Sequence, residues 1–163
     1  MTSSELPGDE QLTDLSFTVN GFISRPPSEV FEAVADPQQL SAYFTTGEAH
    51  GRLETGAEVS WDFHDFPGRF AVRVGEVVAE QSIELFWASS APLGEEADTR
   101  VLFEFVPVDG GARTEVRITE SAWPLSVEGS RAAFGNCMGW TGMLAAMKVW
   151  LEYGINLREG FYK

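Results

Sequence analysis

The sequence predicts an α+β domain in which a curved antiparallel sheet of about six or seven strands holds one long C-terminal helix. The first observation is a proline-free apolar segment of helical period at residues 130–156,. The second is strand-type alternation, broken by turns, over residues 47–121,. The third is the shortness of those turns, because parallel strands need longer crossovers than such turns provide.

The first strand and two short helices are predicted over residues 15–43. Leu15, Phe17 and Val19 alternate with polar residues, which is typical of a half-buried strand,. Two prolines and Ser28 then open a helix, and Asp36-Pro37 ends it,. A second short helix follows over residues 37–43. Two such short helices fill a corner of the fold rather than build a layer.

The middle of the chain predicts about six strands. We expect them near residues 48–53, 57–63, 70–74, 83–87, 101–105 and 114–120, with turns at 54–56, 64–68 and 108–111 and a polar loop at 89–98,. Charged residues occupy the opposite parity to the apolar ones, so one sheet face should meet water and the other the long helix. They are Arg69, Arg73, Glu84, Arg100, Glu104, Arg113, Glu115 and Arg117.

The long helix carries two adjacent apolar stripes. The first includes Ala133, Trp140 and Leu144. The second runs through Phe134, Met138, Thr141, Ala145 and Lys148. Two stripes together predict that the helix presses a wide face against a large apolar surface.

These motifs resemble the START-like helix-grip superfamily (SRPBCC). The segments on which this resemblance rests are RPPSEVFEAVADPQQLSAYF, GEVVAEQSIELFWAS, GARTEVRITESAW and GWTGMLAAMKVWLEYG. Within the superfamily they are most similar to domains homologous to the activator of heat-shock-protein-90 ATPase. The resemblance extends from about residue 15 onward. It implies a helix-grip fold with a hydrophobic-ligand cavity between sheet and helix, and an association with a chaperone or the stress response, but identifies no ligand.

Composition sets further expectations. Eleven basic against 25 acidic residues give a net charge of -14, which disfavours nucleic acid and anionic membranes as partners,. We expect residues 1–14 to form a disordered or loosely attached tail, residues 15–163 to form a single domain, and the protein to be cytoplasmic. Two histidines and one cysteine provide no metal-site spacing, and no phosphate-loop glycine pattern occurs,. We therefore predict no metal and no cofactor.

Inward aromatic residues are the candidate ligand contacts, although each alone could be ordinary core packing. Trp140 on the long helix is a further candidate. The predicted ligand-binding residues are Trp61, Phe63, Phe70, Val72, Phe86, Trp87, Phe103, Phe105, Ile118, Glu120, Trp123, Phe134, Met138 and Thr141.

Glu120 is the most informative of these residues. It shares strand parity with Val116 and Ile118, so its carboxylate should point inward, where it must be hydrogen-bonded or neutralised,. It would then be a polar anchor or general base, with Asn136 or Thr141 as other orienting groups. The slightly favoured alternative is that Glu120, near the strand end, meets water or caps a helix.

Three functions remain open from the sequence. The preferred one is a domain that binds a small hydrophobic or amphipathic molecule, as a monomer or homodimer. The second is a module that interacts with a chaperone or another protein. The third, an enzyme of the cyclase or dehydratase kind, needs two converging titratable groups, and only one inward carboxylate is present.

Overall fold

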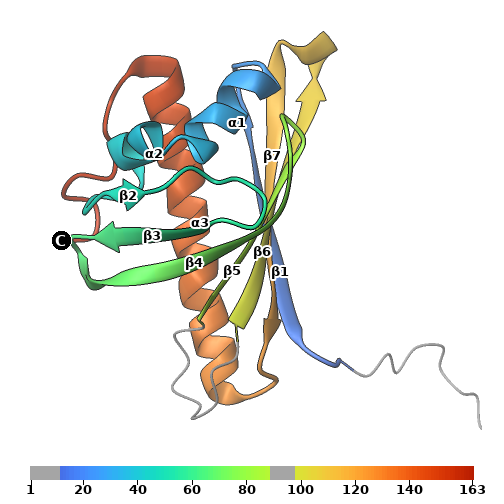
Figure 1. Ribbon diagram of the computed structural model, residues 1–163, viewed down its shortest axis with the longest axis vertical. Helices are drawn as coiled ribbons and strands as arrows, with labels where there is room; N and C mark the ends of the chain where they lie inside the picture. Colours follow the sequence, from blue (N-terminus) through green and yellow to red (C-terminus); the bar gives the residue numbers. More distant parts are fainter. Residues whose placement is uncertain (1–11, 89–97) are drawn as a thin grey trace, which may run out of the picture.

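A computed structural model describes residues 12–88 and 98–163 of the chain. The predicted tail therefore lies mostly outside the described residues, as does nearly all of the loop predicted at 89–98. Figure 1 shows a strongly curved sheet with α3 running along it and two short helices at one end. The elements are β1 Leu15–Ile23, α1 Pro27–Ala35, α2 Pro37–Tyr43, β2 Ala49–His50, β3 Glu58–Phe63, β4 Phe66–Val78, β5 Ser82–Ala88, β6 Asp98–Val108, the 3-10 turn η1 Asp109–Gly111, β7 Arg113–Trp123 and α3 Val127–Tyr153.

The seven strands form one antiparallel sheet in the order β1-β7-β6-β5-β4-β3-β2. Only the β1–β7 pairing joins strands distant in sequence, and it places Phe17 opposite Glu120. Helix α3 packs chiefly on β1, with further contacts to β7 and α2. The predicted α+β helix-grip architecture is confirmed.

Several boundaries differ from the sequence prediction: α3 lies three residues earlier than expected, and β4 is longer at both ends. The strand expected at 48–53 is only the two-residue β2, which ends before Gly51, a residue with a φ of 100°. The turn expected at 64–68 is limited to His64 and Asp65, because Phe66 already pairs with Phe63 in the β3–β4 ladder.

Helix α3 has well-defined ends. The Ser126 side chain accepts a hydrogen bond from the Gly129 amide at 3.0 Å and caps the first turn,. Gly154 ends the helix in the left-handed conformation that glycine adopts at no steric cost,. The first predicted stripe is largely buried, with Trp140 and Met147 in the core.

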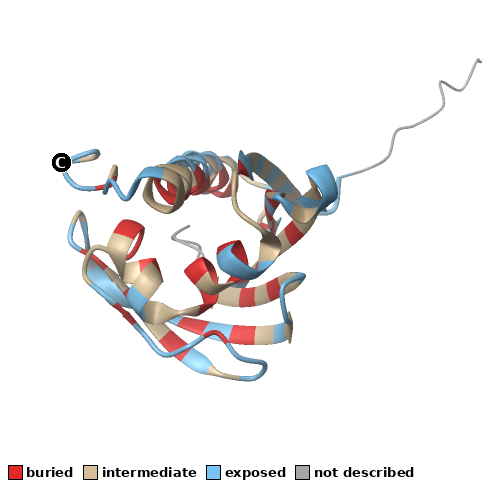
Figure 2. Cartoon of the chain, turned by 90° about the horizontal axis from the view of Figure 1, so that it is seen from above, coloured by how far each residue is buried: buried red, intermediate tan, exposed pale blue. Residues whose placement is uncertain are grey.

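Most of the second predicted stripe of α3 is exposed rather than packed on the sheet. Phe134 is 74% exposed and Met138 60% exposed, and Thr141 and Ala145 are also exposed. Neighbouring positions on a helix differ by about 100°, so this stripe lies beside the contact face. The prediction of a wide buried face was wrong, because the sheet reaches α3 from one side. Figure 2 shows the exposed outer side of the helix above the buried stripe.

The outer face of the sheet is charged, as its parity predicted. Arg100 pairs with Glu84 across β6 and β5 at 2.6 Å, and Arg117 pairs with Glu115 within β7 at 2.7 Å. These pairs are solvent-accessible, so they contribute little to stability but keep this face hydrated.

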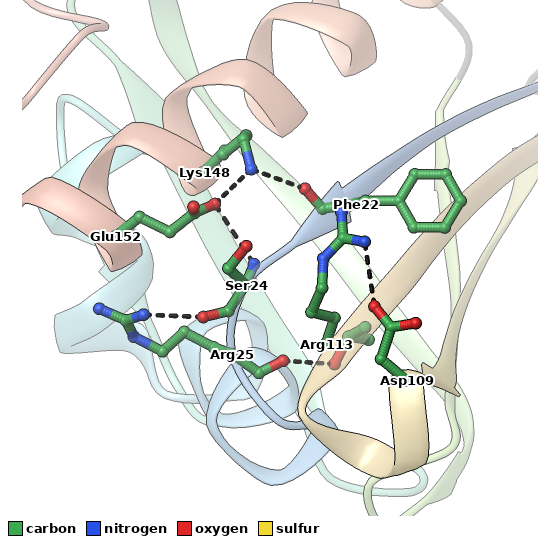
Figure 3. A network of polar contacts seen from close by, with 8 residues as sticks. Phe22, Ser24, Arg25, Asp109, Arg113, Lys148 and Glu152 are labelled. Carbon is green, nitrogen blue, oxygen red and sulfur yellow. Dashed lines mark hydrogen bonds and ion pairs between the residues drawn. The ribbon is translucent and has the colours of Figure 1, made fainter.

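A network of polar contacts fastens the end of β1 to α3 (Figure 3). Lys148 donates to the Phe22 carbonyl at 3.0 Å and to Glu152 at 2.5 Å, and the Ser24 amide donates to Glu152 at 3.3 Å. Burial by itself would raise the pKa of Glu152, but these hydrogen bonds and the Lys148 charge outweigh it and leave that pKa below its ordinary value of 4.5,.

Replacing Glu152 should therefore destabilise the protein in a pH-dependent way. A carboxyl whose pKa is lower in the folded state stabilises that state above pH 4.5, and the contribution disappears as pH falls through the folded pKa,. We expect Glu152→Gln to lower the free energy of unfolding by about 1 kcal/mol at pH 7, and by less near pH 4. Urea unfolding at both pH values measures this difference, with the exposed Glu159→Gln as control. Equal losses at both pH values would contradict it.

Candidate functional site: an aromatic cavity backed by a buried carboxylate

A cavity of about 470 Å³ lies between α3 and the β3–β5 part of the sheet. Its walls come from the end of α2, strands β3 to β5, helix α3 and the C-terminal segment 154–163. It is lined by Phe44, Phe63, Phe66, Phe70, Trp87, Ala88, Arg131, Ala132, Gly135, Asn136, Met138, Gly139, Trp140, Arg158 and Tyr162.

On the helix side the cavity exists because α3 has small residues there. Ala132, Gly135 and Gly139 recur at helical spacing along the wall. A Cβ atom added at Gly135 or Gly139 would meet no atom outside its local surroundings within 4 Å, so both positions face open space. Glycine in a helix interior costs about 1 kcal/mol relative to alanine. Helix α3 thus gives up intrinsic stability at two positions where the fold has room for a side chain.

The rest of the wall is a continuous array of aromatic rings from strands β3 to β5 and from Trp140 of α3. The ring centroids of Phe63 and Phe70 are 6.0 Å apart, those of Phe70 and Trp87 are 6.3 Å apart, and those of Trp87 and Trp140 are 5.5 Å apart. Phe44 stacks on Trp140 from the α2 side at 5.6 Å. Rings at these separations hold each other in place, so this surface is apolar and preformed.

Behind this wall lies Glu120, which has no exposed surface. Its Oε1 accepts hydrogen bonds from Trp140 Nε1 at 2.8 Å and Asn136 Nδ2 at 3.0 Å. Its Oε2 accepts from Thr99 Oγ1 at 2.6 Å and Trp87 Nε1 at 2.9 Å, with Asn136 Nδ2 again at 3.3 Å. The inward orientation predicted from strand parity is confirmed, and the favoured alternative, that Glu120 meets water or caps a helix, was wrong.

The chemistry of Glu120 follows from these partners. All four are neutral donors, and their dipoles stabilise a carboxylate that would otherwise be costly to bury. An ionised carboxylate has about four lone-pair sites, and the four donors use them. Glu120 thus orients two indole rings of the wall, and the structure leaves it no free lone pair with which to act as a base on a bound molecule.

The C-terminal segment closes one end of the cavity. Arg158 Nη2 donates to both carboxylate oxygens of Asp65 at 3.0 Å, and Lys163 Nζ donates to the Asp65 carbonyl at 2.7 Å. The Tyr162 ring lies 6.3 Å from that of Phe66, centroid to centroid. This segment is thereby attached to the β3–β4 turn, and it also reaches α3, where the Tyr162 hydroxyl lies against Gly142.

Of the residues predicted as ligand contacts, four line the cavity: Phe63, Phe70, Trp87 and Met138. Glu120 lies behind the wall. The others that point inward are buried residues outside the lining. They are Trp61, Val72, Phe103, Phe105, Ile118 and Trp123.

Three of the predicted contacts lie elsewhere. Phe86 is on the outer face of the sheet, with its ring 5.2 Å from the Arg73 guanidinium, because it alternates with the inward Leu85 and Trp87. Phe134 and Thr141 are exposed on the second stripe of α3. The inward position expected for these three residues is therefore not found, because of strand parity for Phe86 and of helical position for Phe134 and Thr141.

Sequence reasoning missed several lining residues. The spacing of Gly135, Gly139 and Gly142 inside a long helical pattern was the available signal for the small-residue wall. Phe44, Phe66, Ala88 and Arg131 carried no distinguishing pattern, nor did Arg158 and Tyr162, which reach the cavity only because the chain returns to it after α3.

Among the described residues that line the cavity, the charged ones are Arg131 and Arg158, and no carboxylate or imidazole is present. Nor do three or more His, Cys, Asp or Glu side chains converge as metal ligands anywhere in residues 12–88 and 98–163. Within the same ranges, no helix has the apolar composition over sufficient length to cross a bilayer.

Comparison with known proteins identifies relatives by family and by fold. The family model described as Activator of Hsp90 ATPase homolog 1-like protein matches residues 24–152. No curated protein matches the chain.

Several solved structures share the fold. The protein SSP2350 from Staphylococcus saprophyticus superposes with a TM-score of 0.70 at 22% identity, over 88% of this chain and 96% of that one. The Aha1 dimer from Colwellia psychrerythraea gives a TM-score of 0.68 at 19% identity, over 86% and 98%. DynU16, of the dynemicin biosynthetic locus, gives 0.68 at 23% identity, over 85% of this chain but 48% of that one. At such identities the similarity demonstrates a common fold and carries no function with it.

Replacing Glu120 by glutamine should loosen the wall. The amide would turn N–H groups toward indole and hydroxyl donors, leaving buried polar atoms without partners. We expect Glu120→Gln to lower the free energy of unfolding by about 2–3 kcal/mol and to reduce the near-ultraviolet circular dichroism of the tryptophans. Chemical denaturation measures the loss, with the exposed strand variant Glu58→Gln as control. A Glu120→Gln protein as stable as that control would refute the role assigned to the carboxylate.

Proposed function

The chain belongs to the Activator of Hsp90 ATPase homolog 1-like family, within the START-like superfamily, and we propose that its cavity binds a small hydrophobic or amphipathic molecule. The open space at Gly135 and Gly139, opposite an aromatic wall, is the observation that carries the proposal. A side chain at either position would be tolerated sterically and would strengthen the helix, so the glycines are best explained by the space they leave.

The size and character of the cavity support this function. Small-molecule sites commonly enclose about 300–1,000 Å³, with mainly apolar walls and a few polar groups, and the cavity of about 470 Å³ falls in that range. Contact with the aromatic wall would supply most of the binding free energy, at about 25 cal/mol per Å² of apolar surface removed from water.

A protein-interaction role is the second candidate, and one observation favours it. Val127, Phe134 and Met138 share one face of α3, and all three are exposed. Exposed apolar residues grouped on one face often mark contact surfaces. The family description names a chaperone ATPase activator, and a structural neighbour is a dimer. A chaperone and a second copy of this chain are therefore the partners to test in a pull-down and by sedimentation.

Catalysis has less support. The described lining offers no pair of acid and base groups, and the donors around Glu120 use its lone pairs,. Binding without a chemical step, and without a cofactor, is the function that these groups can perform.

Filling the space at Gly139 should weaken binding without harming the fold. We expect the neutral fluorescent probe N-phenyl-1-naphthylamine to bind the wild type and to quench Trp87 and Trp140, which line the cavity. Gly139→Leu should weaken that binding at least about tenfold, because its side chain would occupy the cavity. Gly139→Ala should raise the free energy of unfolding by about 0.5–1 kcal/mol, since helix propensity improves and no contact is lost.

Ala145→Leu is the matched control, because Ala145 is exposed on the same helix. Titration with the probe and urea unfolding provide the two measurements. Probe binding that survives unchanged in Gly139→Leu would show that the cavity is not the site.

A further inference from the structure

We propose that the molecule bound in this cavity is an aromatic anion, and that Arg158 and Tyr162 in the C-terminal segment bind its acidic group. This inference rests on the proposed function, because it names the class of ligand and the group that recognises it. The segment lies beyond residues 24–152, which the family model matches. The recognition is therefore assigned to a part of this chain outside the family-matched region.

The charges around the cavity point to an anion. The protein has a net charge of -14, yet the charged residues of the described lining are Arg131 and Arg158. Of the two carboxylates next to these lining residues, Asp65 is already paired with Arg158 through Nη2. The Glu120 carboxylate lies behind Trp87 and Trp140 and disfavours an acidic group against that part of the wall,. An aromatic anion would therefore place its rings on the indoles and its charge toward the buried guanidinium of Arg158.

Arg158 has donors that the described protein groups do not use. Its side chain is buried, with 7% of the residue exposed. Asp65 engages Nη2 alone. Nε is buried without a hydrogen-bond partner, and Nη1 has none among the described residues. A buried donor left unpaired costs about 1–3 kcal/mol, and a guanidinium offers these donors in a geometry suited to carboxylate and sulfonate oxygens.

Tyr162 supplies a second unused donor beside the first. Its ring centroid lies 4.8 Å from the Arg158 Cζ, and its hydroxyl group is buried without a partner. The hydroxyl oxygen lies against α3 at Gly142, where an added Cβ atom would come within 2.3 Å of it. Phenylalanine would fill the same ring position without burying an unpaired hydroxyl group. The phenol oxygen is thus accommodated by a glycine and has no hydrogen-bond partner in the part of the chain that the structure describes.

The segment must move slightly for these donors to reach a ligand, because Arg158 Nε and the Tyr162 hydroxyl are covered in the structure. Within residues 12–88 and 98–163, its polar attachment to the sheet runs through one residue, Asp65. The unpaired donors raise the free energy of the closed arrangement, and an acidic group entering from the cavity would satisfy them. Binding therefore couples occupation of the cavity to a shift of residues 157–163.

Two probes with one carbon skeleton test the proposal. 8-Anilino-1-naphthalenesulfonate carries an acidic group that N-phenyl-1-naphthylamine lacks, and both fluoresce on entering an apolar site. Burying a sulfonate without donors is costly, so an unspecific cavity would favour the neutral probe. We expect the wild type to bind the sulfonate at least about tenfold more tightly. Tyr162→Phe should weaken sulfonate binding about fivefold and leave the neutral probe unchanged.

Two further measurements locate the effect. Tyr162→Phe should unfold at the same or a higher urea concentration than the wild type, because no protein hydrogen bond is lost. Arg131→Gln is the matched control, since Arg131 is the other, exposed guanidinium of the lining, and it should keep most of the preference for the sulfonate.

The other possible results distinguish a failure of this inference from a failure of the proposed binding function. Equal binding of both probes, or a preference that Tyr162→Phe leaves intact, overturns this inference and leaves the proposed function standing. If Arg131→Gln loses the preference for the sulfonate and Tyr162→Phe keeps it, the anion binds at Arg131, and this inference is also overturned. If Tyr162→Phe is less stable than the wild type, the hydroxyl has a protein partner, and this inference is overturned. If neither probe binds, both proposals fail.

Discussion

The buried carboxylate of Glu120 is the constraint on which the arrangement of sheet and helix depends. Its donors come from β5, β6 and α3, while Glu120 itself is on β7. A carboxylate without these donors would be very costly to bury, and the indole N–H groups would in turn lose their acceptor. Three strands and the helix can therefore pack in only one arrangement. This arrangement fixes the orientation of the Trp87 and Trp140 rings.

Helix α3 combines a well-packed face with glycines that lower its intrinsic helical stability. Trp140 and Met147 hold it to the core, while Gly135 and Gly139 leave space and Gly142 admits the Tyr162 hydroxyl. Local sequence preferences that oppose stability tend to occur where function requires them. In this chain they fall on the single stripe of the helix that faces the cavity and its C-terminal wall.

The sequence allowed the strands, their faces and the inward position of Glu120 to be predicted, because a period of two leaves little ambiguity once one face is apolar. The same rule, applied strictly, would have placed Phe86 outside. The exposed stripe with Phe134 was misjudged because apolar residues on a helix do not show how far the partner surface extends. Arg158 and Tyr162 were beyond prediction, since no periodicity in a short irregular segment indicates where it returns. The glycine spacing in α3 was visible and indicates the cavity wall only in retrospect.

The pairing of β1 with β7 has a consequence for biosynthesis. Phe17 and Glu120 are roughly 100 residues apart, so at about 5–20 residues per second β1 leaves the ribosome several seconds before its partner strand. During that interval its hydrogen-bonding edge has nothing native to pair with, which exposes the nascent chain to misassociation. Helix α3 emerges later still. The complete cavity, whose walls include α3, Arg158 and Tyr162, can therefore form only after translation of the whole domain.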